Sequence, residues 1–399
     1  MSLVRPALLT RKAYVPATPD RQLIRLHANE NPWSIEEDDD SATRLSVAVG
    51  KVAARAATGG KTPALASNTE QHATQPVPER ELNRYPEPRP FDLVNAMAAY
   101  YEVQADQLLP VRGSDDGIDL LIRTFCEASQ DSIVVSSPAF SMYASFAEIQ
   151  GVSVVDVPLI KTDTTFLLDI DAIVSSVEQH AEQKLVFLCT PNNPTGHSLS
   201  ERDIVAVCER LAQRAVVVVD EAYIEFSNRT SNCKRIGSLP NLVVLRTMSK
   251  AFGAAGIRMG AVIAHKEIIA VLQSITSPYA LSTPAIELAL EGFTQAGLSQ
   301  LQSRCRFLVE HRVQLAEALS DHPLVTTVFD SDANFLLVRF SDTKSVYQTL
   351  QEAGVLVRDF SAAKGAEGCL RISIGKENEN RQILAVLDRL QASLAGGTA

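Results

Sequence analysis

The chain has 399 residues, of which 46% are hydrophobic and 21% are charged, and its formal net charge is −10. This length is sufficient for two domains with hydrophobic cores. The acidic balance argues against a nucleic-acid-binding protein, because a negative surface repels phosphate backbones.

The cysteines, histidines and apolar runs argue against further classes of protein. Six cysteines occur without a CxxC pair, which predicts reduced thiols in a cytoplasmic protein. The seven histidines show no HExxH or paired spacing, so we expect no metal site. No apolar run reaches the roughly eighteen residues of a membrane span, and the N-terminal apolar run is too short for a secretory signal.

Residues 34–79 differ in composition from the rest of the chain. They are rich in Ala, Thr, Ser and charged residues and contain no aromatic residue, which predicts a flexible insert within an N-terminal arm, 1–84. The sequence TGGKT inside the insert imitates a phosphate-binding loop. Arg55 stands where that motif requires Gly, and no strand precedes it, so we reject a P-loop.

From residue 91 onward, apolar runs of strand length alternate with helical or loop segments. Residues 117–128 have apolar side chains at helical spacing, and four successive valines at 216–219 indicate a strand buried on both faces. We predict an α/β domain over 85–285, with a mostly parallel sheet and right-handed crossovers. Its strands are expected within 131–137, 151–159, 184–190, 214–220 and 241–247.

The last part of the chain has fewer strands and predicts a smaller α+β domain over 286–399. A Ser-Thr-Pro sequence at 282–284 marks the start of a helix within 278–293. Beyond this helix, strands are expected within 324–330, 334–340, 354–360 and 369–375.

Three successive strands of the large domain lead into polar residues that carry chemistry. The first is followed by Asn193, the second ends at Asp220 with Tyr223 close behind, and the third is followed by Ser249 and Lys250. Asn193 and Asp220 are 27 residues apart, and Asp220 and Lys250 are 30 apart, each about one strand–helix–strand repeat. Because ligands bind beyond the carboxyl ends of such strands, we expect one shared site.

A phosphorylated ligand with a carbonyl group and a cationic ring explains these residues together. The turn GSDDG at 113–117 opens the predicted helix and forms a cradle for an anion. Arg258 lies eight residues after Lys250, and a buried cation needs a partner. Pyridoxal 5′-phosphate (PLP) requires an amine for its aldehyde, a carboxylate for its ring nitrogen and a site for its phosphate. Lys250, Asp220 and Arg258 supply these groups.

Motifs along the chain carry a resemblance to a known family. In chain order they are HANENP, LNRYPEP, GSDDGIDLLIRTFC, PNNPTG, VVVVDEAYIEF, LRTMSKAFGAAGIRMG, PYALST, DANFLLVRF and CLRISIG. Together they resemble the histidinol-phosphate aminotransferases, within the fold-type I PLP aminotransferases, over nearly the whole chain except 34–79. The resemblance implies a large domain with a mostly parallel central sheet and a smaller α+β domain.

The resemblance implies a role for each residue around the cofactor. Lys250 forms the Schiff base and moves a proton between the substrate α-carbon and the cofactor C4′, and Asp220 pairs with the pyridine nitrogen. Asn193 and Tyr223 hydrogen-bond the phenolic oxygen of the cofactor. The residues expected at the phosphate are Ser114, Asp115, Ser249 and Arg258, joined by Tyr85 from the neighbouring subunit of a homodimer.

The resemblance also implies a substrate side and shows two departures. Arg371 is expected to hold the carboxylate of glutamate or 2-oxoglutarate, Arg358 the phosphate of histidinol phosphate, and Asn29 to line this side, with Tyr14 as a weaker match. Where the family usually has a Tyr that stacks on the pyridine ring, this chain has Phe140, so stacking is kept but the phenol is lost. The longer join between HANENP and LNRYPEP predicts an altered substrate gate.

The function implied is an aminotransferase of histidine biosynthesis. It interconverts L-histidinol phosphate plus 2-oxoglutarate with imidazole-acetol phosphate plus L-glutamate. An aromatic amino acid aminotransferase and a phosphothreonine decarboxylase stay open as alternatives, because relatives share these motifs. A noncatalytic PLP-binding regulatory module is a third alternative, but the acidic balance, the lack of room for a DNA-binding domain before residue 34 and the retained Lys250 argue against it.

Overall fold

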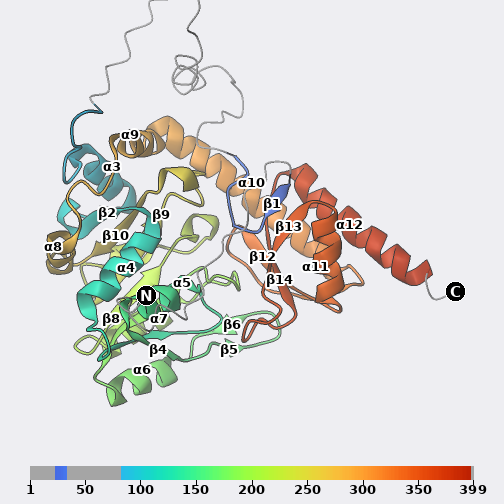
Figure 1. Cartoon of the computed structure of the whole chain (residues 1–399), viewed down its shortest axis with the longest axis horizontal. Coiled ribbons are helices and arrows are strands. Elements are labelled where there is room, and N and C mark those ends of the chain that lie inside the picture. The colour runs from blue at the N-terminus through green and yellow to red at the C-terminus, as the bar shows by residue number, and fades with distance from the viewer. Residues whose placement is uncertain (1–22, 34–81, 397–399) are drawn as a thin grey trace, which may run out of the picture.

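The computed structural model describes residues 23–33 and 82–396. The insert predicted at 34–79 and Tyr14 lie outside the described residues. Two sheets are placed side by side along the long axis of the molecule (Figure 1). None of the helices in the described ranges has the length and apolar character needed to cross a membrane.

The larger sheet has seven strands in the order β2-β10-β9-β8-β7-β3-β4. Neighbouring strands run parallel except at β10, which is antiparallel to both β2 and β9. The predicted mostly parallel sheet is therefore confirmed. Its strands are β2 (Leu108–Val111), β3 (Ser132–Val135), β4 (Ser153–Asp156), β7 (Gln183–Cys189), β8 (Val216–Asp220), β9 (Leu242–Thr247) and β10 (Gly260–Ala264).

Helices cover both faces of the larger sheet, as a mostly parallel sheet requires. Successive residues of β8 point to opposite faces: Val218 packs in one core with α4, α5 and α8, whereas Val217 and Val219 pack in another with α3, α6 and α7. All three valines are fully buried, so the prediction for this run is confirmed. The helices are α3 (Phe91–Tyr101), α4 (Gly113–Phe125), α5 (Met142–Gln150), α6 (Ile170–Gln179), α7 (Glu201–Arg210) and α8 (Lys266–Ile275).

The smaller sheet has five strands in the order β1-β13-β14-β12-β11. Only β1 and β13 pair in parallel, and the other neighbours are antiparallel. The long helix α10 runs from α9 toward this sheet (Figure 1). The elements are β1 (Ile24–Leu26), β11 (Val325–Val328), β12 (Phe335–Phe340), β13 (Val355–Asp359), β14 (Cys369–Ser373), α9 (Thr283–Gly292), α10 (Gln295–Ser320), α11 (Thr343–Glu352) and α12 (Glu377–Gly396).

Short elements connect these layers. A two-stranded hairpin lies between β4 and α6, and four single 3-10 turns occur in the loops of the large domain. They are β5 (Ile160–Lys161), β6 (Phe166–Leu167), η1 (Ala105–Gln107), η2 (Ile224–Phe226), η3 (Asn232–Arg235) and η4 (Ala255–Ile257).

Sequence patterns located nine strands of the described residues and missed five, β1, β2, β5, β6 and β10. Each predicted strand overlaps an observed one, and α9 begins at Thr283 with Ser282 as its N-cap, as predicted. The helix expected over 117–128 instead runs from Gly113 to Phe125. The five missed strands have two to five residues each, and no separate apolar run was assigned to any of them. The predicted boundary between the two domains, after residue 285, falls within α9. This boundary stays a prediction.

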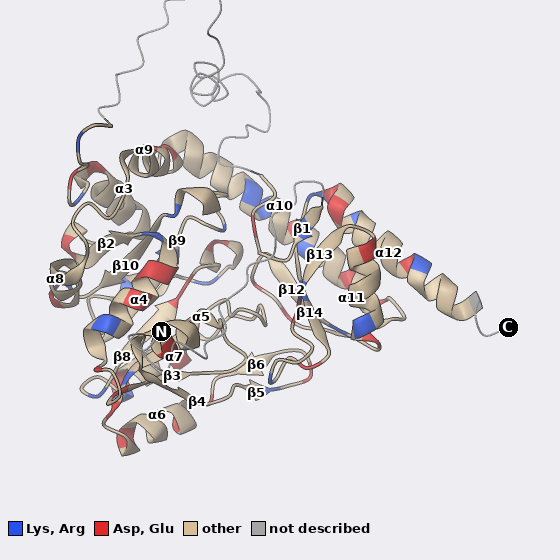
Figure 2. Ribbon diagram, viewed as in Figure 1, with Lys and Arg blue, Asp and Glu red and all other residues tan. Residues whose placement is uncertain are grey.

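Charged residues are sparse on the strands of the larger sheet, which are mostly tan in Figure 2. Four occur there: Asp156, Lys184, Asp220 and Arg246. Asp156 is exposed and Lys184 is half-buried, whereas Asp220 and Arg246 are buried. Because burying a charge is costly unless it is compensated, the two buried charges point to a special environment at the ends of β8 and β9.

Candidate active site

Asp220 is a buried carboxylate at the end of β8. Its side chain receives a hydrogen bond from the Tyr143 hydroxyl at 2.8 Å and another from the backbone N–H of Ala222 at 3.1 Å. Within the described part of the chain, Asp220 forms no ion pair. Burial raises the pKa of Asp220 to about 6, because it disfavours the charged form. The two neutral donors lower this pKa by less than burial raises it. A cationic group bound here would stabilise the ionised form.

Lys250 follows β9 and brings an amine to the same end of the sheet. Its Nζ donates a hydrogen bond to the backbone oxygen of Ala28 at 2.9 Å and lies 5.7 Å from the ring centre of Tyr223. Burial lowers the pKa of Lys250 to about 8, and the nearby charge of Arg371 lowers it further. A lysine with this pKa is partly deprotonated near neutral pH, as a nucleophilic amine must be.

Tyr223 is buried and belongs to a network that joins the two domains. Its hydroxyl accepts a hydrogen bond from Nδ2 of Asn29 at 3.1 Å. The Asn29 side-chain oxygen accepts one from the Ser373 hydroxyl, and its backbone oxygen accepts one from Asn334. Asn29 has a φ of 52°, a left-handed conformation that Asn tolerates better than most residues. The structure therefore brings Asn29 and Tyr223 together, although Asn29 was predicted only from its motif.

Arg371 on β14 reaches from the small domain to the end of the large sheet. Its guanidinium donates hydrogen bonds to the side-chain oxygen of Asn193 and, at 2.7 Å, to the backbone oxygen of His27. It also lies over the rings of Phe335 and Phe360, with its central carbon 5.2 and 5.5 Å from their centres. These contacts fix one guanidinium beside Asn193 and within electrostatic range of Lys250.

Arg358 on β13 lies directly opposite Arg371 in the antiparallel pairing of β13 and β14. Directly opposite residues in such a pair project their side chains to the same face of the sheet. Burial lowers the pKa of the neighbouring His27, and the charges of Arg371 and Arg358 lower it further, although Glu30 opposes them. The two arginines thus place positive charge beside His27, and Arg371 also acts on the amine of Lys250.

The start of α4 and Arg258 form a candidate anion cradle. No side chain caps this helix at Arg112, so its N-terminus is open to an anion. Arg258 approaches Ser249 at 3.3 Å and Asp115 at 3.4 Å, and a Cβ at Gly113 would meet its guanidinium at 2.7 Å. A side chain at position 113 would therefore displace the Arg258 guanidinium, and the φ of 78° also favours glycine. Ser114 lies with Asp115 in the first turn of α4.

Phe140 contacts Tyr143, the hydrogen-bond partner of Asp220, whereas Tyr85 lies at the surface of the chain. Phe140 precedes α5, and its ring packs edge-on against Tyr143 with centres 5.5 Å apart. Tyr85 is 80% exposed and stacks on Tyr279, with ring centres 4.5 Å apart. Among the described residues, no other aromatic ring contacts Tyr85. The chain therefore leaves Tyr85 at its surface, where a second subunit has access to it.

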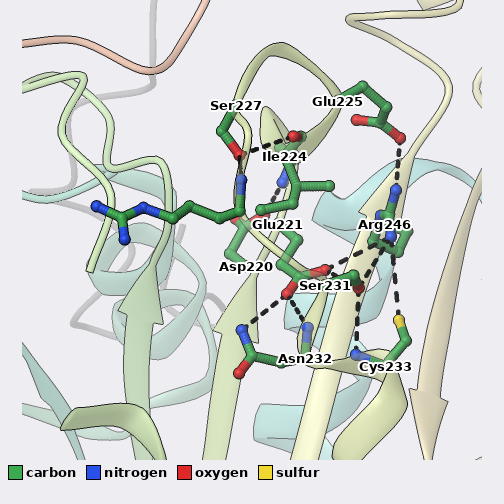
Figure 3. Close-up of polar contacts among 11 residues, drawn as sticks. Asp220, Glu221, Ile224, Glu225, Ser227, Ser231, Asn232, Cys233 and Arg246 are labelled. Carbon is green, nitrogen blue, oxygen red and sulfur yellow. Dashed lines mark hydrogen bonds and ion pairs between the residues drawn. The ribbon is translucent and has the colours of Figure 1, made fainter. Parts of the chain in front are cut away.

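A buried ionic cluster begins at Glu221, next to Asp220 (Figure 3). Arg246 on β9 is paired with Glu225 at 2.5 Å and with Glu221 at 3.5 Å. Glu221 also accepts hydrogen bonds from the Ser231 hydroxyl at 2.5 Å and from the Asn232 backbone at 2.6 Å. The cluster fastens the turn after Asp220 to strand β9, which leads to Lys250.

The sequence predictions missed Tyr143, Glu221 and Arg246. Tyr143 lies three residues after Phe140 in SPAFSMY, and only the folded chain brings it to Asp220, 77 residues away. Glu221 and Arg246 each stand beside or within a strand that is otherwise apolar. A charged residue in such a position is a signal that sequence analysis could have used.

The fold and these residues fit PLP, and comparisons with known proteins agree. The family of class I and II aminotransferases matches residues 59–387. Histidinol-phosphate aminotransferase of Aeromonas salmonicida strain A449 is 43% identical over 313 residues, which are 78% of this chain and 86% of that protein. The enzyme of that name from Stenotrophomonas maltophilia strain R551-3 is 43% identical over 78% of this chain and 85% of its own length.

The chain belongs to the histidinol-phosphate aminotransferase family.

A solved structure supports the same fold. The histidinol-phosphate aminotransferase of Sinorhizobium meliloti, determined in complex with PLP, matches with a TM-score of 0.79 and 21% identity over 99% of each chain. As a histidinol-phosphate aminotransferase family member, the protein is a PLP-dependent transaminase that acts on small molecules. The buried Asp220, the half-buried amine of Lys250 and the glycine-lined cradle are the features of its own structure that fit this cofactor.

Proposed function

We propose that this enzyme interconverts L-histidinol phosphate plus 2-oxoglutarate with imidazole-acetol phosphate plus L-glutamate, as a step of histidine biosynthesis. The observation that carries the proposal is the pair of Arg358 and Arg371, opposite each other on β13 and β14. Relatives of this name at 43% identity support the same assignment.

The two arginines suit the charges of both substrates. Histidinol phosphate carries a phosphate and no carboxylate, whereas 2-oxoglutarate carries two carboxylates. Arginine binds either group through paired N–H donors. We assign the substrate phosphate to Arg358 and the carboxylate to Arg371, whose guanidinium is already oriented by Asn193 and His27. Phenylalanine has one carboxylate, which Arg371 can bind, but no phosphate for Arg358.

Lys250 and Asp220 carry the acid–base chemistry in this proposal. When bound, PLP would supply an electron sink for the reaction. Lys250 removes the proton from the substrate carbon that bears the amino group, and its lowered pKa of about 8 suits it to act as a base near neutral pH. Asp220, as a carboxylate, keeps the cofactor ring nitrogen protonated.

The remaining residues bind and orient. The backbone N–H groups of Ser114 and Asp115 would hold the cofactor phosphate together with Ser249 and Arg258, and Phe140 would stack on the pyridine ring. Asn193 and Tyr223 donate to the cofactor oxygen, and Asn29 orients the Tyr223 hydroxyl through its 3.1 Å hydrogen bond. The contact between Asn193 and Arg371 links the cofactor side of the site to the substrate side.

The proposed assembly is a homodimer in the cytoplasm in which Tyr85 completes the site of the partner subunit. The 80% exposure of Tyr85 supports this assembly, because an exposed aromatic side chain is available to a partner. Mixing Tyr85→Ala subunits with Lys250→Ala subunits tests it. If Tyr85 acts across the interface, hybrid dimers regain one complete site and more activity than either parent. If Tyr85 acts within its own chain, mixing restores nothing.

The proposed reaction is tested by a half-reaction. The visible absorption of the bound cofactor is followed after L-histidinol phosphate or L-phenylalanine is added separately to the holoenzyme. We expect histidinol phosphate to convert the cofactor rapidly and phenylalanine to convert it slowly. A preference for phenylalanine would overturn the proposal in favour of aromatic transamination.

A matched pair of variants assigns the substrate phosphate. Arg358→Gln should slow the reaction of histidinol phosphate by about 10- to 100-fold, because one charge-assisted contact is lost, and should leave the slow reaction of phenylalanine, which has no phosphate, nearly unchanged. The control is Arg339→Gln on β12, an arginine of the same sheet that donates to the backbone oxygen of Glu367. Equal effects of both variants would contradict the assignment of Arg358.

A further inference from the structure

We propose that Tyr143 is a positioning residue that holds the Asp220 carboxylate in place for the cofactor ring nitrogen. The inference rests on the proposed role of Asp220. Its basis is the 2.8 Å hydrogen bond from the Tyr143 hydroxyl to Oδ2 of Asp220.

The two neutral donors fix the orientation of the carboxylate. Tyr143 donates to Oδ2, and the backbone N–H of Ala222 donates to Oδ1 at 3.1 Å. Rotation of the Asp220 side chain would break both bonds. Each carboxylate oxygen can accept about two hydrogen bonds, so acceptor capacity is left for the ring N–H of the cofactor.

The Tyr143 side chain is itself held by rigid neighbours. It is only 1% exposed. Its ring stacks on Phe187 of β7 with centres 4.8 Å apart, and Phe140 packs against it edge-on at 5.5 Å. Strand β7 lies beside β8, with Cys189 directly opposite Asp220. Because Tyr143 contacts Phe140 as well, one side chain supports both the proposed ring-stacking residue and the ring-nitrogen partner.

A phenol is chemically suited to this position because it orients the carboxylate without neutralising it. Burial and the neighbouring carboxylate raise the pKa of Tyr143 well above its ordinary value, so the hydroxyl stays protonated and acts as a donor. An arginine or a protonated histidine would pair with Asp220 and compete with the cationic ring of the cofactor. A neutral donor stabilises the carboxylate and leaves its charge for the ligand.

The test compares Tyr143→Phe with Tyr101→Phe in the holoenzyme. Each variant removes one hydroxyl from a buried tyrosine, and the Tyr101 hydroxyl has no hydrogen-bond partner in the described structure. The readouts are the rate of cofactor loss after dilution into PLP-free buffer, and the kinetic constants for 2-oxoglutarate. We expect Tyr143→Phe to lose the cofactor about 10- to 100-fold faster and to lower kcat while KM stays the same, because a hydrogen bond to a charged group is lost.

Either of two results overturns the inference. One is wild-type cofactor retention with wild-type kcat in Tyr143→Phe, and the other is an equal effect of Tyr101→Phe. Should Tyr143→Phe fail to fold, 3-fluorotyrosine at position 143, a stronger donor, is expected to slow cofactor loss, and faster or unchanged loss contradicts the inference. Cofactor loss does not depend on the amino donor, so a preference for phenylalanine would overturn the proposed substrate and leave this test intact.

Discussion

Asp220 and Glu221 are adjacent buried carboxylates with opposite surroundings. Glu221 is fully buried, pairs with Arg246 and accepts hydrogen bonds from Ser231 and Asn232 (Figure 3). Asp220 is 2% exposed and receives only neutral donors. Within the described residues, the chain thus provides a cation for one carboxylate and none for the other.

The difference separates a structural charge from a functional one. A buried charge without a counter-charge destabilises a protein, so it persists where a ligand supplies the missing partner. Glu221 is compensated inside the chain, and it fastens the turn that carries Asp220 and Tyr223. Asp220 is compensated, in our account, by the protonated ring of bound PLP.

The largest expected effect is that of Lys250→Ala. We expect transamination to fall by more than about 10⁴-fold, because the variant loses both the amine that binds the cofactor and the base that moves the proton. The far-ultraviolet circular dichroism spectrum should stay unchanged, since the side chain forms few structural contacts. Turnover like that of the wild type would contradict the mechanism.

Next in size is the loss of stability in Glu221→Gln. Removing one partner of a buried ion pair leaves the Arg246 cation less compensated, and typically costs about 3–5 kcal/mol of unfolding free energy. The measurement is urea unfolding with the cofactor bound.

Glu201→Gln is the matched control for this change. Its ion pair with Arg235 is exposed, with 44% and 48% of the two side chains accessible. Exposed pairs contribute at most about 1 kcal/mol. Similar losses in both variants would mean that Glu221 is no more structural than a surface residue.

The pH dependence of the apo-protein gives a third prediction. Because burial raises the pKa of Asp220 from 3.8 to about 6 in the folded state, the folded form binds the proton more tightly than the unfolded form. The contribution of Asp220 to the free energy of unfolding is therefore greatest below about pH 4. It falls by about 3 kcal/mol as the pH rises from about 4 to about 6. The charges of Asp115 and Glu221 act in the same direction.

Comparing the apo forms of wild type and Asp220→Asn isolates this contribution. The difference between their unfolding free energies should change across pH 4 to 6 and stay constant above that range. A difference that does not change with pH would show that the carboxylate of Asp220 is already compensated within the protein.

The smallest expected effect is that of Tyr85→Phe. If its hydroxyl contacts the cofactor phosphate of the partner subunit, its loss should speed cofactor dissociation by about 10-fold, the low end for one hydrogen bond to a charged group. Tyr279→Phe is the control, since it keeps the aromatic stack with Tyr85. Unchanged dissociation in Tyr85→Phe would limit this residue to a packing role.

The sequence predicted the features that depend on local pattern. Apolar, β-branched runs marked the inner strands, as at Val216–Val219, because a strand covered on both faces needs such residues. Positions just after strand ends then indicated Asn193, Asp220 and Lys250, because the parallel sheet brings those ends to one edge.

Contacts between distant segments could not be predicted in this way. Asn29 bonds to Tyr223 across 194 residues, and Arg371 to Asn193 across 178, so both contacts depend on how the two domains meet. Strand β1 has three residues and is defined by its pairing with β13. Tyr143 carried no motif of its own, and only its place beside Asp220 reveals it. The roles of the individual site residues stay predictions until variants are measured.

The most direct test of the central claim is the thermal unfolding of wild type and Asp220→Asn at pH 7.5, each with and without PLP. Without the cofactor, we expect Asp220→Asn to be at least as stable as the wild type, because an uncompensated buried charge is removed. With the cofactor, we expect the wild type to gain more stability than the variant. A variant that is less stable without PLP and gains as much from PLP as the wild type would contradict the account, because Asp220 would then be a structural carboxylate like Glu221.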